Sequence, residues 1–403
     1  MATSYHGRRG LTLAALLGAF MLGDMQTARA ELEIDAQYPG GNIVVERIEG
    51  DQVYLRPDLR DTNGWWFYWN FRVRGAAGQT LTFQFTGNNP MGVRGPAVST
   101  DGGRSWSWLG AERVKGASFA YEFSADQAEV RFSFAIPYQE ENLRQFLASY
   151  RDNPHLSVQE LCKSRKGRGV ERIHVGQLAG EPDHRIVLTA RHHACESMAN
   201  YVIEGFLDAA LDDTDEGKWF REKVEVLVVP FVDKDGVEDG DQGKNRKPHD
   251  HNRDYRGDSI YPSVDAIRSF VPTWSKGRLS MAMDMHCPWI RGSHNEVIYM
   301  VGNADPAMWQ QQVALGKILE EVQQGPLVYR TTDNLPFGTA WNTTGNYGDL
   351  MSCTMWATQI EGIRLATSFE IPYANAADRP VTADSARAFG RDLARAVRQY
   401  LTD

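Results

Sequence analysis

The sequence is short of cysteine and of positive charge. Its four cysteines contain no CxxC pair, which excludes a zinc-ribbon site, and four in a chain of 403 residues do not make a disulfide scaffold. The formal net charge is −9, which argues against nucleic acid or an anionic membrane as partner, because both require a basic face. No internal repeat or low-complexity tract occurs. What remains is an ordinary globular composition, long enough for two domains.

The chain also lacks apolar runs of membrane length, and the longest such run lies near the N-terminus. Arg8 and Arg9 precede the apolar stretch Leu11–Leu22, which is too short to cross a bilayer. Ala28-Arg29-Ala30 then has the small-x-small form of a cleavage site. We therefore expect residues 1–30 to be a signal peptide cleaved near Ala30, and the mature protein to be periplasmic or secreted, without membrane contact. A retained membrane anchor is the alternative.

Residues 31–140 have the pattern of an antiparallel β-sandwich. Leu81, Phe83 and Phe85 alternate with polar residues, as in a half-buried strand. Turn sequences such as Asn63-Gly64 separate short segments of this kind. The aromatic run Trp65–Phe71 has two interpretations, a buried strand or a sugar-binding platform.

Residues 141–403 change in character. Apolar strands alternate with helical segments, which is typical of an α/β domain with a buried, mostly parallel sheet flanked by helices. The predicted strands are Arg185–Ala190, Val224–Val232, Leu279–Met285, Asn295–Val301 and Leu365–Ile371; the predicted helices are Asn142–Tyr150, Ser197–Leu211 and a last helix that carries Ala386, Phe389, Leu393 and Val397 on one face.

Polar side chains with metal-binding potential follow two of these strands. His193 and Glu196 are three residues apart at a strand-to-helix turn, a spacing that lets both reach one ion. His286 ends another buried strand and completes a possible site of two histidines and one glutamate. A catalytic zinc site has such a ligand set and keeps one position open for water. Carboxyl ends of parallel strands are where such sites form.

Two further residues have side chains suited to hydrolysis at this site. Arg253 is a natural clamp for a carboxylate, because guanidinium binds that group through two parallel hydrogen bonds. Glu370 lies in the last predicted strand, where a carboxylate that faces the metal would be the general base for the attacking water.

Together these motifs resemble the zinc metallocarboxypeptidases, in particular the cytosolic-carboxypeptidase branch with its N-terminal β-sandwich. They occur in the family's order and on the expected elements. The sequence departs from the branch at Ala194-Cys195, where Pro-Gly is usual, and at Asp233-Lys234, where Asn-Pro is usual. The motifs are Arg191-x-His193-x-x-Glu196, Asp235-Gly236-Val237, Asp250-His251-Asn252-Arg253, Asp284-Met285-His286, and Glu370.

The resemblance implies a zinc-dependent hydrolase that removes C-terminal amino acids from peptides with a free terminal carboxylate. It implies one zinc ion held by His193, Glu196 and His286. Asp250 would orient His193, Glu370 would be the base, and Arg246 would stabilise the oxyanion. Asn252 and Arg253 would hold the terminal carboxylate. The branch trims glutamates with basic pocket residues, for which this sequence offers Arg246, Lys247 and Arg364.

Several assignments stay open at this point. His192 is a possible ligand in place of His193, although consecutive residues near a strand end point to opposite sides. Tyr347 is a candidate phenolic helper or a packing residue. Cys195 and Cys287 each adjoin a predicted ligand, so they form either a disulfide or two buried thiols.

Two other functions use the same features. The first is a zinc hydrolase for other amides, namely a peptidoglycan stem-peptide carboxypeptidase or amidase, or an N-acyl amino acid deacylase. The second is a degenerate hydrolase that only binds peptide or glycan. The presence of all three ligands and Glu370 argues against the second.

Overall fold

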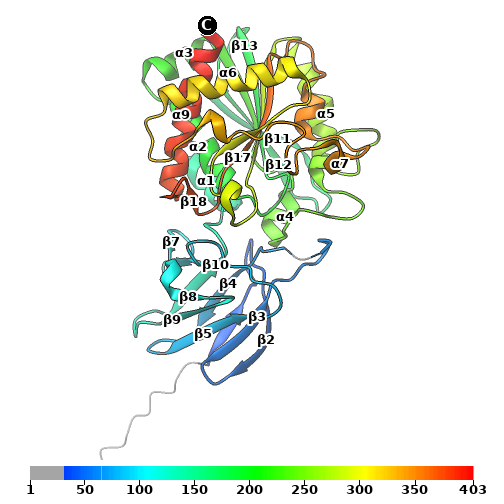
Figure 1. Ribbon diagram of the computed structural model, residues 1–403. Helices are drawn as coiled ribbons and strands as arrows, with labels where there is room; N and C mark the ends of the chain where they lie inside the picture. The colour runs from blue at the N-terminus through cyan, green and yellow to red at the C-terminus, as the bar shows by residue number, and fades with distance from the viewer. Residues whose placement is uncertain (1–30, 65, 403) are drawn as a thin grey trace, which may run out of the picture.

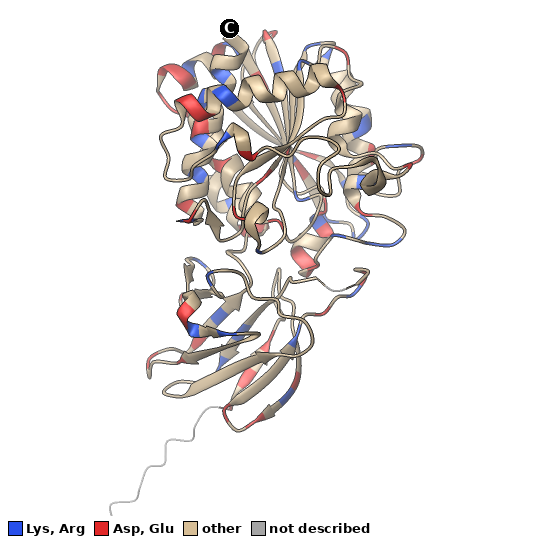
Figure 2. Cartoon of the chain, viewed as in Figure 1, with Lys and Arg blue, Asp and Glu red and all other residues tan. Residues whose placement is uncertain are grey.

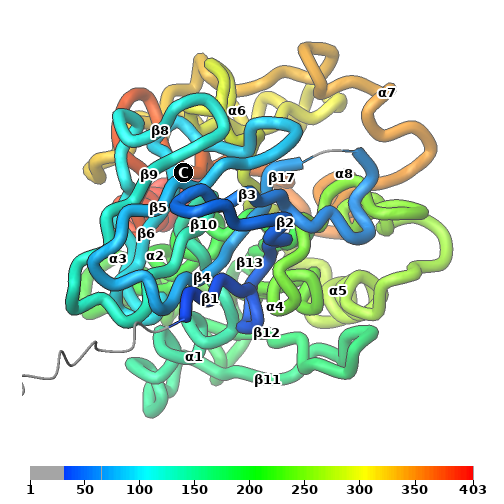
Figure 3. The backbone as a smooth tube through the Cα atoms, turned by 90° about the horizontal axis from the view of Figure 1, so that it is seen from below, coloured from blue at the N-terminus to red at the C-terminus, as the bar shows by residue number. Residues whose placement is uncertain are grey.

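The computed structural model describes residues 31–64 and 66–402, so the expected signal peptide lies outside the described residues. A smaller β domain lies below a larger α/β domain (Figure 1). Figure 3 views the molecule from the side of the β domain, whose blue and cyan strands lie in front. None of the described helices combines the length and the apolar character that spanning a bilayer requires.

The β domain contains two five-stranded sheets, with strand orders β1-β4-β10-β6-β7 and β2-β3-β5-β9-β8. The expectation of wholly antiparallel sheets needs one correction, because β3 and β5 are parallel. The intervening β4 belongs to the other sheet, so β5 returns beside β3 in the same direction. The strands are β1 (Glu33–Asp35), β2 (Val44–Glu49), β3 (Gln52–Arg56), β4 (Asn70–Arg74), β5 (Thr80–Phe85), β6 (Ala97–Ser99), β7 (Ser107–Trp108), β8 (Val114–Lys115), β9 (Ser118–Glu122) and β10 (Glu129–Ser133).

An aromatic core fills the β domain. The ring of Phe83 lies 4.9 Å from that of Phe119 and 5.3 Å from that of Phe132, measured between centroids. Phe67 and Trp69 are fully buried. Burial of Phe67 and Trp69 excludes these two rings from a sugar-binding platform, since a platform needs exposed ring faces.

The α/β domain is built on a seven-stranded sheet of order β11-β12-β14-β13-β15-β17-β16. Its four central strands are parallel, and the strands outside them are antiparallel to their neighbours. The strands are β11 (Leu156–Lys163), β12 (Gly169–Gly176), β13 (His184–Ala190), β14 (Val224–Val229), β15 (Leu279–His286), β16 (Tyr299–Val301) and β17 (Leu365–Glu370), with a separate pair β18 (Asn375–Ala376) and β19 (Arg379–Pro380).

Helices cover both faces of this sheet, which is why its central strands are apolar on both sides. The strands stay largely free of charge, whereas Lys, Arg, Asp and Glu are spread over the outer helices and loops (Figure 2). Helix α2 packs along α9, and α5 lies on the other side with its own apolar cluster. The helices are α1 (Glu140–Ala148), α2 (Met198–Leu211), α3 (Asp215–Lys223), α4 (Lys234–Asp239), α5 (Pro262–Ser275), α6 (Pro306–Val322), α7 (Thr344–Tyr347), α8 (Cys353–Ala357) and α9 (Ala383–Thr402).

The predicted mixed α/β class is confirmed, and each predicted strand or helix overlaps an observed one. The sequence missed β11 and β12. The edge strand β11 is largely exposed, and its apolar alternation is limited to Leu156 and Val158. It also missed α5 and α6. The division at residues 140 and 141 stays a prediction.

Candidate active site

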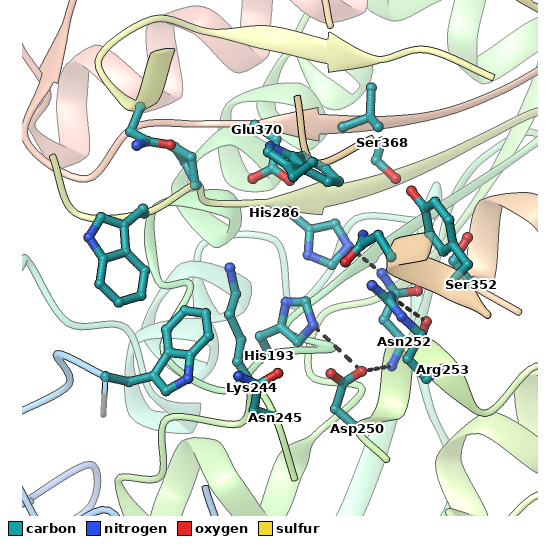
Figure 4. A pocket seen from close by; sticks show the side chains of 18 of the residues that line it. His193, Lys244, Asn245, Asp250, Asn252, Arg253, His286, Ser352, Ser368 and Glu370 are labelled. Atoms are coloured by element: carbon teal, nitrogen blue, oxygen red, sulfur yellow. Dashed lines mark hydrogen bonds and ion pairs between the residues drawn. The ribbon is translucent and has the colours of Figure 1, made fainter. Parts of the chain in front are cut away.

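A pocket of about 300 Å³ lies at the carboxyl ends of the central parallel strands. His193 and Glu196 follow β13, His286 ends β15 and Glu370 ends β17. The register of β15 and β17 sets His286 directly opposite Glu370. In Figure 4 the side chains of His193, His286 and Glu370 point into one space. Strand register therefore brings together residues that are far apart in the sequence.

Arg191 shapes the turn that carries the first two of these residues. Its backbone adopts a left-handed conformation, with φ of 61°, which is unfavourable for a residue with a side chain. Its buried guanidinium donates hydrogen bonds to the carbonyl of Ala194, the carbonyl of Tyr138 and the amide oxygen of Asn200. These bonds hold the turn from Arg191 to Glu196 in one shape.

The side chains of the three predicted ligands converge on one another. Nδ1 of His193 lies 2.9 Å from one carboxylate oxygen of Glu196, and Nδ1 of His286 lies 2.7 Å from the other. The ligand atoms of the three residues all lie within 4.8 Å of one another. Two imidazoles and one carboxylate are a donor set that suits zinc. These residues therefore fit a zinc ion, and their role as its ligands stays a prediction.

Each histidine has a carboxylate on its far side. Nε2 of His193 lies 3.6 Å from Oδ1 of Asp250, and Nε2 of His286 lies 2.6 Å from Oδ2 of Asp284. Such contacts fix the orientation of metal-binding imidazoles. Burial opposes charge on His286, yet Asp284 and Glu196 raise its pKa well above the usual value. The structure thus places Asp250 where the sequence predicted it, behind His193.

His192 is excluded from the pocket, although it belongs to a second cluster with Asp284 and His286. Its Nδ1 lies 2.8 Å from Oδ1 of Asp284, and its Nε2 lies 2.7 Å from the hydroxyl of Tyr255. With both ring nitrogens engaged and no surface exposed, His192 supports Asp284 from behind.

Glu370 is buried at the pocket wall with one carboxylate oxygen, Oε2, that has no hydrogen-bond partner among the described residues. Burial raises its pKa to about 7, against the opposing effect of His286 and Lys244. A carboxyl group with a pKa near neutrality and an unpaired oxygen is suited to accept and return a proton.

Asn252, Arg253 and Tyr347 line the opposite part of the pocket. The guanidinium carbon of Arg253 lies 4.9 Å from the ring centroid of Tyr347, and no described carboxylate forms an ion pair with it. Asn252 accepts a hydrogen bond from the backbone of Cys353, and its amide nitrogen lies 3.1 Å from Nε2 of His286. Arg253 is therefore available for an anionic group in the pocket.

The structure does not bring Arg246 into the pocket, contrary to the expectation that it faces the oxyanion. Its guanidinium forms ion pairs with Asp61, Asp233 and Asp241 at 2.7, 2.6 and 3.1 Å. Three carboxylates hold it away from the pocket, and one of them, Asp61, belongs to the β domain. Lys247 and Arg364, the other basic candidates, do not line the pocket either.

The sequence missed Lys244, whose ammonium group lies 2.8 Å from Oε1 of Glu196 and in reach of the carbonyl of Cys287. It also missed Trp66 and Trp289, whose rings lie 4.7 Å apart at the pocket rim. Trp66 comes from the β domain. A lysine in a glycine-rich polar loop has no periodic signal, and only the fold brings it to the metal turn.

The four cysteines are all free thiols, so the suggested disulfide between Cys195 and Cys287 is wrong. The amide of Gln242 donates to the sulfur of Cys195, and the hydroxyl of Tyr373 lies 3.4 Å from it. Burial raises the pKa of the Cys195 thiol to about 12, which keeps it neutral. The Cys195 side chain packs in the protein interior and does not line the pocket.

A family model, related sequences and solved structures all show similarity of this chain to carboxypeptidases. Residues 143–299 match the zinc carboxypeptidase family. The chain is 22% identical to cytosolic carboxypeptidase 6 of Caenorhabditis elegans over 381 residues, which cover 84% of this chain and 80% of that protein. It is 29% identical to human cytosolic carboxypeptidase 2 over 196 residues, 46% of this chain, and the match spans only 21% of that longer protein.

Two solved structures share the whole fold. A metallo-carboxypeptidase from Burkholderia cenocepacia has a TM-score of 0.70 with 19% identity, and covers 92% of this chain and 99% of its own. A metallo-carboxypeptidase from Pseudomonas aeruginosa, in complex with (2-guanidinoethylmercapto)succinic acid, has a TM-score of 0.71 with 20% identity, and covers 92% and 99%. At this identity the likeness shows the fold alone.

Proposed function

Since the chain carries a zinc carboxypeptidase domain homologous to the cytosolic carboxypeptidases, we propose that it removes single amino acids from peptides that present a free terminal carboxylate. One observation carries the proposal. His193 and His286 of the triad, the predicted base Glu370 and Arg253, which has no ion-pair partner among the described residues, line one pocket. Glu196 lies buried behind the two histidines and contacts both. A carboxylate clamp within the same pocket as the base restricts cleavage to the chain end.

The residues of the pocket divide the chemistry among them. When bound at the triad, zinc would polarise the scissile carbonyl and lower the pKa of a water molecule. Glu370 accepts the proton of the attacking water and returns it to the leaving amine. Arg253 binds the terminal carboxylate, with Asn252 beside it. Lys244 is the cation that lies nearest the triad, and it stabilises the negative charge that develops on the carbonyl oxygen.

Asp250 and Asp284 keep the imidazoles in place during this reaction. Each carboxylate faces the Nε2 atom of one histidine, which leaves both Nδ1 atoms directed at Glu196. We expect one ion per chain, because the two clusters of possible ligands share His286.

The test combines zinc content with release of terminal residues. Peptides with free and amidated ends are incubated with the protein and with Glu370→Gln. We expect about one zinc per chain in both proteins, release from free ends only, and a rate about 10²–10⁴-fold lower in Glu370→Gln. Equal release from amidated ends would contradict the carboxylate clamp. Bound zinc with no release from any peptide would contradict the peptidase activity.

The alternatives of peptidoglycan amidase and acyl amino acid deacylase are not favoured, because the matched family and relatives are carboxypeptidases. The non-catalytic alternative is likewise not favoured.

Export from the cytoplasm is a further proposal, supported by the sequence of residues 1–30 alone. The names of the cytosolic relatives point to a different compartment. Fractionation of cells and N-terminal sequencing of the protein distinguish export from retention in the cytoplasm. A mature protein that begins near Glu31 outside the cytoplasm supports export, and an intact cytoplasmic chain contradicts it.

A further inference from the structure

A second cavity, of about 370 Å³, adjoins the catalytic pocket. Both are lined by Val301, Tyr347, Ser352 and Ser368. The second cavity extends from these residues toward α6 and α8. The two cavities therefore adjoin beside the predicted base and the carboxylate clamp.

No charged residue is found among the described residues that line the second cavity. Arg246, Lys247 and Arg364, the basic candidates for recognition of glutamate, are all absent from it. The lining is formed by Val301, Gly302, Asn303, Ala304, Gln312, Phe337, Asn342, Thr344, Tyr347, Gly348, Met351, Ser352, Thr354, Met355, Thr358, Gln359, Ala366 and Ser368.

The buried amides of this lining are already engaged with the protein. The Gln312 side chain donates to the carbonyls of Val301 and Ala366 and to the hydroxyl of Thr367, and its oxygen accepts from the backbone of Asn303. The Asn342 side chain donates to the carbonyls of Gly302 and Leu335. These amides therefore have little capacity to solvate an ionised side chain.

The geometry relates this cavity to the residue that would be released. Ser368 precedes Glu370 by two positions on β17, so both side chains lie on the same face of the strand, about 7 Å apart. Tyr347 lines both cavities and contacts Arg253. A terminal residue with its carboxylate at Arg253 and its amide bond at Glu370 directs its side chain past Ser368 and Tyr347.

We propose that the second cavity binds the side chain of the C-terminal residue and that the protein prefers an uncharged residue there, such as methionine, leucine, phenylalanine or glutamine. The inference rests on the proposed function and names its substrate class. An ionised side chain would lose part of its hydration there and would meet no counter-charge among the described lining residues, which is unfavourable. Met351, Met355 and Phe337 offer apolar and adaptable surface to a neutral one.

The first test is a peptide series that differs only in the last residue: Leu, Met, Phe, Gln, Glu or Lys. We expect kcat/KM to be at least about tenfold higher for the four uncharged residues than for Glu or Lys. Met355→Arg should raise release of Glu relative to Leu, because it places a cation in the cavity. Gln310→Arg adds the same charge on the exposed side of α6, outside the cavity lining, and should leave the preference unchanged.

Release of Glu or Lys as fast as Leu, with turnover intact, overturns this inference and leaves the proposed function standing. A second measurement is independent of turnover: calorimetric binding of N-acetylmethionine, N-acetylglutamate and N-acetyllysine to Glu370→Gln. Tighter binding of N-acetylmethionine supports the neutral cavity, and equal or weaker binding overturns it. Absence of release from every peptide contradicts the proposed function, and the binding series then decides the inference separately.

Discussion

Lys244 and Arg246 are two positions apart, yet their surroundings assign them different tasks. Lys244 is directed at Glu196, whereas Arg246 is surrounded by three aspartates. Glu196 and burial act in opposite directions on Lys244, and the net effect is a pKa above its usual value. Lys244 is therefore a permanent cation in the pocket, whereas Arg246 stabilises the fold through its ion pairs with three aspartates.

A pair of substitutions separates these two roles. Lys244→Met should lower kcat by about 10²-fold or more through loss of charge stabilisation, and should also cost stability because it leaves the buried Glu196 without this cation. Arg246→Met should leave the buried Asp233 without its partner and cost about 3 kcal/mol of stability, with a smaller effect on kcat. Steady-state kinetics and urea unfolding measure the two effects, and the reverse pattern would return the catalytic role to Arg246.

Glu370 predicts a pH dependence of stability in the metal-free protein. Its folded pKa of about 7 exceeds the unfolded value of about 4.3, so the folded state holds its proton more tightly. The stability that this proton confers is fully present below about pH 4 and is lost as the pH rises through 7. We expect Glu370→Gln to gain stability relative to the wild type between pH 5 and pH 8. Urea unfolding at both values, with chelator present, measures this gain, and a constant difference would contradict the raised pKa.

At the scale of elements, one loop must approach the metal turn closely. Gly243 has φ of 82°, and a Cβ atom there would lie 2.2 Å from the backbone nitrogen of Ala194. The adjacent Gln242 carbonyl accepts a hydrogen bond from the backbone of Cys195. The loop and the turn of His193 therefore form one unit, which only a residue without a side chain permits.

Gly243→Ala should displace this turn, lower zinc affinity at least about tenfold and reduce Tm. Gly257→Ala is the matched control, because Gly257 has φ of 69° and nothing within 4 Å of the added Cβ. It should cost only about 1 kcal/mol for the left-handed backbone and leave zinc binding intact. Chelator competition gives the affinities, and equal zinc binding by the two variants would show that the close approach is irrelevant.

At the scale of the molecule, the β domain contributes to the candidate active site. Arg246 is paired to Asp61, Asn63 donates a backbone hydrogen bond to Asn245, and Trp66 lines the pocket. The Gln242 side chain accepts hydrogen bonds from the backbones of Phe67 and Tyr68. The β domain therefore supports the loop that carries Lys244.

Gln242→Leu should leave two buried backbone N–H groups without acceptors and destabilise the protein by about 2–4 kcal/mol. Loss of this link should also separate unfolding of the two domains into two transitions. Calorimetry of the zinc-loaded protein measures both, with the exposed Gln310→Leu as control. A single transition at the wild-type Tm would show that the domains are held together elsewhere.

The sequence alone predicted the fold class from apolar periodicity. It indicated the set of His193, Glu196, His286 and Glu370 through their positions at or after predicted strands and through the resemblance of their motifs to the zinc metallocarboxypeptidases. Arg253 and Asp250 were named by local motif. Their meeting in one pocket agrees with those assignments, and their roles stay predictions until measured.

The residues that surround His193, Glu196, His286 and Glu370 could be identified only from the tertiary structure. Lys244 in place of Arg246, the contribution of Trp66 and the uncharged second cavity depend on contacts such as that between Asn63 and Asn245. Loops and domain contacts of this kind have no periodic pattern in sequence, since they arise from packing between segments that fold from distant parts of the chain. The candidate residues were therefore readable from their motifs, whereas the surroundings of the pocket depend on how the segments pack.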